Sequence, residues 1–131
     1  MSLLTVEQMK SANGIKFQDV EAWGGTVRVR SMTSEMQDVW FRWVNRNRKP
    51  GVEPDYDGLR RFMCALCMVD EDGKALFVTP ENATIDQKMA AVAELSELFR
   101  EKDAVTCDAI HEAAAKLNGL RKDDVEDRAK N

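Results

Sequence analysis

Hydrophobic and polar residues alternate in the N-terminal part of the chain, with the period of a β-strand. The alternation begins near residue 15 and returns without interruption in Thr26–Arg30, where β-branched residues are frequent. Gly24 and Gly25 interrupt it, as expected of a turn. We therefore predict an antiparallel hairpin connected through residues 21–25. Its side chains should divide into Val27 and Val29, facing the core, and Arg28 and Arg30, facing solvent or a partner.

From residue 34 the hydrophobic period changes to that of an amphipathic helix. Ser34 and Gln37 have the spacing of a capping box, and the helix should end before Lys49-Pro50-Gly51. Asp57 is expected to cap a second helix, which extends toward Val69. The predicted core positions are Met36, Val39, Trp40, Trp43 and Val44 in the first helix, and Leu59, Phe62, Met63 and Leu66 in the second.

The remaining sequence predicts more helices separated by short turns. Asp70–Lys74 has turn composition, and Thr79-Pro80-Glu81 is a favourable helix start. Gly119 suits the position after a helix, where a left-handed conformation is common. The expected elements are a short strand at Leu76–Val78, helices over 85–101 and 104–118, and a last short helix from Asp123-x-x-Glu126.

Together these patterns predict an α+β fold that is predominantly helical. We expect four to five helices with a small antiparallel β-hairpin near the N-terminus. The chain of 131 residues has the length of a single domain, here 1–131. Residues 1–13 show little pattern and are expected to be a flexible arm, and residues 121–131 a frayed C-terminal helix.

Composition narrows the classes of protein. Apolar residues make up 44% and charged residues 32%, which is typical of a globular chain. The longest apolar run, Phe62–Val69, is too short to span a bilayer. No signal peptide is recognisable, and the number of cysteines is odd. We therefore expect free thiols in a reducing cytoplasm. The net charge of -4 is uneven: residues 1–61 carry +2 and residues 62–131 carry -6. Such asymmetry can drive self-association, basic half against acidic half.

One set of residues has the composition of a zinc site. Cys64-x-x-Cys67 and Cys107-x-x-x-His111 would supply three thiolates and one imidazole. The alternative is that the cysteines are small hydrophobic core residues, because Cys64 and Cys67 lie inside the longest apolar run. We favour the core interpretation and keep a zinc-stabilised domain as an alternative.

Other candidate chemistry has weaker support. A pairing of Cys107 with His111 as nucleophile and base lacks a third orienting group. The segment from Asp70 to Glu81 resembles a calcium loop, but it has Lys74 and Ala75 where a ligand and a glycine are needed. We therefore expect neither catalysis nor a cofactor.

A basic cluster raises the alternative of a nucleic-acid-binding domain. Its arginines are expected to face away from the buried Trp40 and Trp43, whereas base stacking needs exposed aromatic side chains. An acidic chain is also a poor candidate for sequence-independent binding, so we expect no nucleic-acid partner. The cluster comprises Arg42, Arg46, Arg48, Lys49, Arg60 and Arg61.

Three segments in order resemble a known family. They are Trp23–Glu35, in which a Val-Arg strand leads into a helix, Cys64–Phe77, in which an apolar helix leads into Asp-Glu-Asp-Gly and Leu-Phe, and Leu117-Asn118-Gly119-Leu120 with the tail that follows. Their order and spacing resemble the tail assembly chaperones of long-tailed (siphovirus-type) bacteriophages. The resemblance covers about residues 20–131.

The resemblance implies a function without catalysis or cofactor. Such chaperones bind the long tape measure protein in many copies and keep it soluble until tail-tube subunits assemble around it. A ribosomal frameshift typically adds a C-terminal extension that recruits the major tail tube protein, and Ala129-Lys130-Asn131 is compatible with a slippery sequence. The implied location is the host cell cytoplasm, with no membrane partner and no place in the mature virion.

For the surface that contacts a partner, we select residue types that are frequent in binding hot spots. Trp23 lies beside the predicted hairpin turn, two arginines lie on the strand and two on the first long helix. The predicted partner-binding residues are Trp23, Arg28, Arg30, Arg42 and Arg46.

Overall fold

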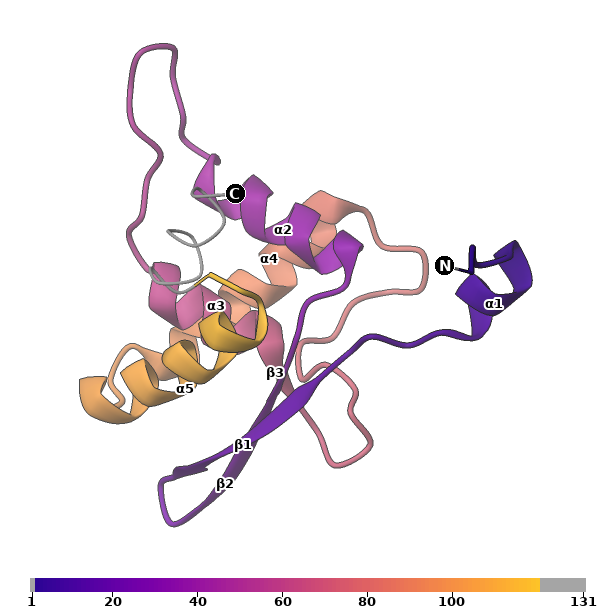
Figure 1. The fold of residues 1–131 in the computed structure, drawn as a ribbon. Helices are drawn as coiled ribbons and strands as arrows, with labels where there is room; N and C mark the ends of the chain where they lie inside the picture. Colours follow the sequence, from indigo (N-terminus) through magenta and orange to yellow (C-terminus); the bar gives the residue numbers. More distant parts are fainter. Residues whose placement is uncertain (1, 121–131) are drawn as a thin grey trace, which may run out of the picture.

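A computed structural model describes residues 2–120 and confirms an α+β fold with much more helix than strand (Figure 1). A small antiparallel sheet lies at one end of a cluster of helices. The elements are α1 (Val6–Ser11), β1 (Phe17–Ala22), β2 (Gly25–Arg30), α2 (Ser34–Val44), α3 (Leu59–Cys67), β3 (Met68–Val69), α4 (Ile85–Ser96), the 3-10 turn η1 (Glu97–Phe99) and α5 (Ala104–Leu117).

The predicted hairpin is confirmed, and its turn is tighter than expected. Ala22 pairs with Gly25, so only Trp23 and Gly24 connect β1 and β2. Both have positive φ, 51° for Trp23 and 78° for Gly24, as two-residue turns of the type that matches strand twist require. Trp23 therefore lies in the turn itself rather than beside it.

The third strand differs from the prediction. Met68 and Val69, at the end of the apolar run, leave the helix and pair antiparallel with Val29 and Arg28. The expected strand at Leu76–Val78 is absent from the described sheet, where only a single bridge joins Ala75 to Val69. Met68 and Val69 occupy the edge of β2 instead.

The core is built around α3, which is buried from Phe62 to Cys67. Helices α2, α4 and α5 pack around it, and the hairpin packs on α5. The ring of Phe62 stacks on Trp43 at 4.5 Å between centroids and meets Trp40 at 6.2 Å. The predicted helical stripes therefore do face a common core.

Three predicted helix starts are wrong by small amounts with clear causes. The α2 cap is Thr33, whose hydroxyl accepts the Met36 amide, because Thr33 has the extended conformation that a cap needs. Gly58, with φ 76°, precedes α3 in place of Asp57. Thr79-Pro80-Glu81 begins no helix, since α4 starts only after Thr84, which forms a full capping box with Gln87.

The N-terminal arm contains a helix that the sequence pattern did not predict. Residues Val6–Ser11 form α1, which has a capping box between Thr5 and Gln8 but no buried residue. Figure 1 shows α1 to one side of the other helices. The expected frayed helix at 121–131, with Asp123-x-x-Glu126, lies outside the described residues.

Within residues 2–120, no helix has both the length and the apolar character needed to cross a membrane.

Candidate partner-binding surface and a polar cavity

The predicted partner-binding arginines of the hairpin are engaged within the chain. Arg28 lies on the exposed side of β2 and donates from Nε to Asp19 Oδ1 at 2.7 Å across the strand pair. This hydrogen bond lowers the pKa of the Asp19 carboxyl and raises that of the Arg28 guanidinium. Arg30 is half-buried and donates to the carbonyl of Ser31 at 3.2 Å. Val29, between them, is fully buried as predicted.

Trp23 attaches the hairpin turn to the start of α5. Its Nε1 donates to Asp103 Oδ1 at 2.9 Å, and its ring stacks on Phe99 with 6.2 Å between centroids. Lys102 Nζ lies 5.8 Å from the ring centroid, within reach of a cation–π contact. The side chain nevertheless stays 45% exposed.

The arginines of α2 are also paired. Arg42 contacts Asp86 of α4 at 2.9 Å, and this pair lies on the surface. Arg46 lies 3.6 Å from the centroid of the Trp43 ring and contacts Asp55 at 3.2 Å. The prediction that Arg46 faces away from the tryptophan stripe is therefore wrong, because its guanidinium covers the outer face of Trp43. Trp43 Nε1 is buried without a hydrogen-bond partner within the described residues.

These five residues do not form one surface. Trp23, Arg28 and Arg30 belong to the hairpin, whereas Arg42 and Arg46 lie on α2. Figure 1 shows the hairpin turn well apart from α2. Their role in binding a partner stays a prediction, and a single partner segment would have to extend along the molecule to reach both groups.

The three cysteines are part of the core, as the favoured interpretation predicts. All three are free thiols and all are buried. The thiol of Cys64 donates to the carbonyl of Cys107, and that of Cys67 to the sulfur of Met63, each at 3.5 Å. Burial raises the pKa of Cys64 and of Cys67 to about 12, which keeps both thiols protonated at neutral pH.

The zinc alternative has no geometric support. Within residues 2–120, which include the four proposed ligands, no group of three or more His, Cys, Asp or Glu side chains is placed to hold a metal ion. His111 is half-buried on α5, and burial is the main cause that lowers its pKa. The Asp70 segment is a turn, as expected, since Asp70 Oδ1 accepts the amides of Asp72 and Lys74.

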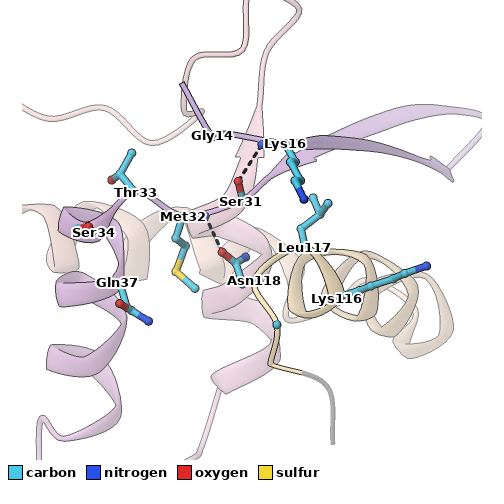
Figure 2. Close-up of a pocket in the computed structure, with 11 residues that line it drawn as sticks. Gly14, Lys16, Ser31, Met32, Thr33, Ser34, Gln37, Lys116, Leu117 and Asn118 are labelled. Carbon is cyan, nitrogen blue, oxygen red and sulfur yellow. Dashed lines mark hydrogen bonds between the residues drawn. The ribbon is translucent and has the colours of Figure 1, made fainter. Parts of the chain in front are cut away.

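A polar cavity of about 650 Å³ lies where the hairpin, α2 and α5 meet (Figure 2). Two connections hold its floor. The amide of Met32 donates to Asn118 Oδ1 at 2.6 Å, and Lys16 and Ser31 are joined through an amide–hydroxyl bond of 2.9 Å and a backbone bond of 2.8 Å. The lining residues are Gly14, Lys16, Ser31, Met32, Thr33, Ser34, Gln37, Lys116, Leu117, Asn118 and Gly119.

The walls of this cavity are mainly polar. Its walls offer hydroxyl, amide and backbone groups, and Figure 2 shows Gln37 on one wall with Lys16 and Lys116 on the opposite side. Lys116 points away from Ser31 and Met32. Sequence analysis missed the cavity because its walls come from residues about 100 positions apart. Most of the lining residues nevertheless lie in two of the segments that carry the family resemblance.

Comparison of the chain with protein-family models, with curated proteins and with solved structures gives no match to any of the three.

Proposed function

We propose that this protein is a tail assembly chaperone of a long-tailed bacteriophage. It binds the tape measure protein in multiple copies in the host cell cytoplasm, keeps it soluble, and gives way to tail-tube subunits as they polymerise. It uses no cofactor and performs no catalysis. Recruitment of the major tail tube protein through a frameshifted extension belongs to the same proposal and concerns residues beyond those described.

The observation that carries the proposal is the convergence of the three resembling segments. The segment with β2 pairs with the segment that ends α3, through Arg28 with Val69 and Val29 with Met68. It also meets the third segment, through the bond from the Met32 amide to Asn118. Segments far apart in the sequence thus form one packed unit, as expected if their shared order reflects a shared fold.

Charge pairing disfavours the nucleic-acid alternative. A phosphate backbone is bound by clustered, available cations. Here Arg42, Arg46 and Arg60 each contact a carboxylate of the same chain, Asp86, Asp55 and Asp108 respectively. Binding a polyanion through these three side chains would require breaking their pairs.

Coexpression tests the proposal. The tape measure protein from the same genome should be insoluble when expressed alone and soluble when this chain is present. The matched control is this chain with Phe62→Ala, which removes a fully buried ring from the core. A tape measure protein that stays insoluble beside well-folded wild-type chain would refute the proposal.

A further inference from the structure

The N-terminal arm presents apolar side chains that nothing in its own molecule buries. No residue of α1 is buried, and Leu3, Leu4, Val6 and Met9 are all exposed. The hydroxyl of Thr5 accepts the Gln8 amide, and the Thr5 amide donates to the Gln8 side chain, so the helix is capped. A helix this short is marginal in water unless packing supports it. The arm therefore has the properties of a segment that packs against a partner.

A second unfilled apolar surface is formed by residues between 76 and 98. It is a groove of about 390 Å³, within the range of binding clefts, between the 76–78 loop and the C-terminal half of α4. Val78 is 87% exposed and Leu98 60% exposed. Glu94 is the single charged residue of its lining. The full lining is Leu76, Phe77, Val78, Ala91, Glu94, Leu95 and Leu98.

We propose that the arm of one copy occupies this groove on a second copy of the chain. Val6 and Met9 are three positions apart and share a face of α1, and Lys10 follows at the edge of that face. Lys10 contacts Glu7 of its own helix at 3.5 Å, in an exposed pair of the kind that contributes little. With Val6 and Met9 in the groove, Lys10 exchanges Glu7 for Glu94 of the second copy. Figure 1 shows α1 well apart from α4 of its own molecule.

The geometry of this contact determines the kind of assembly. Arm and groove are different surfaces, so each copy offers one of each and the contact is head-to-tail, which extends into open arrays. The contact is small, and interfaces of limited area are weak and transient. We therefore expect assemblies that grow with concentration and dissociate on dilution. This inference does not depend on the proposed function.

Sedimentation velocity of single variants and of their mixture tests the proposal. Wild-type chain should form larger species as its concentration rises. Met9→Asp places a charge on the apolar face of the arm, and Leu98→Asp places a charge in the apolar groove. Each variant should stay monomeric. Mixed together they should give one-to-one dimers and nothing larger, because the intact arm of one fits the intact groove of the other. Val52→Asp and Val105→Asp, at exposed apolar sites outside both surfaces, should assemble like wild type.

Charge reversal provides an independent second test. Lys10→Glu should weaken assembly, and adding Glu94→Lys to the same chain should restore it. The proposal is overturned if wild-type chain is monomeric at every concentration, if the two variants mixed together form no dimer, or if the control variants lose assembly equally. Circular dichroism of each variant verifies that it is folded, so that loss of assembly reports on the surface alone.

Discussion

Asp103 connects two parts of the molecule through one carboxylate. It caps α5 by accepting the Thr106 amide at 3.0 Å and also accepts the Trp23 indole N–H at 2.9 Å. Hydrogen bonds to a charged carboxylate favour the charged form. The bonds from Thr106 and Trp23 accordingly lower the pKa of Asp103 from 3.8 to about 2. The charged carboxylate therefore adds to the packing that holds the hairpin on α5.

This lowered pKa predicts a stability loss in acid. A carboxyl whose pKa is lower in the folded state stabilises fully above its unfolded pKa, here 3.8, and loses this contribution as the pH falls toward about 2. Urea unfolding midpoints should thus drop across that window in wild-type chain and drop less in Asp103→Asn. Glu53→Gln, in an exposed loop, is the control and should follow wild type. Equal acid sensitivity in Asp103→Asn would contradict the assignment.

The buried thiols predict slow chemistry. With pKa values of about 12, Cys64 and Cys67 contain almost no thiolate at neutral pH, and they have no solvent access. A disulfide reagent such as Ellman's should react with them only as fast as the protein opens, and at once after denaturation. Addition of zinc should leave the native rates unchanged. Rapid native labelling, or protection by stoichiometric zinc, would contradict burial in the core.

Partners of single residues could not be read from the sequence. The alternation of Thr26–Arg30 correctly separated Val29, which is buried, from Arg28, which is exposed. It contained no information on Asp103, which is 80 positions from Trp23, or on Asp86, which is 44 positions from Arg42. Such pairs depend on how elements pack, and periodicity describes only one element at a time.

Among the elements, α3 determines whether the fold holds together. Phe62 is fully buried and stacks on Trp43, so Phe62→Ala removes a ring from the point where α2 meets α3. Large-to-small changes of this kind cost about 3–5 kcal/mol of unfolding free energy. Phe41→Ala on the exposed side of α2 is the matched control and should cost about 0.5 kcal/mol or less. Urea unfolding measures both, and similar losses would show that the core is misassigned.

Element types were predictable where periodicity was long, and the misses have physical causes. The stripes of α2, α4 and α5 each extend over three turns or more, which makes them unambiguous. β3 has only two residues and follows α3 without a polar break. The pattern of the apolar run therefore predicts a single helix. α1 has little apolar periodicity, and none of its residues is buried. The polar cavity could not be anticipated, since it exists only once α5 ends beside the link from β2 to α2.

For the whole molecule, the uneven charge is partly compensated within one chain. Ion pairs join the basic half to the acidic half, namely Arg42 with Asp86 and Arg60 with Asp108. A further pair joins Glu35 of the basic half to Lys88 of the acidic half, between α2 and α4. Exposed pairs contribute little to stability, so their main effect is to reduce the number of charges free for other molecules. Contacts with partners are then expected to depend more on apolar side chains than on net charge.

The mass of the complex formed with the tape measure protein tests the central claim most directly. The tagged tape measure protein, purified after coexpression with this chain, is analysed by light scattering coupled to size-exclusion chromatography. A coating chaperone predicts one tape measure chain with many copies of this protein, in a number that rises with tape measure length when that length is varied. A complex with a single copy at every length, or no complex, would contradict the account.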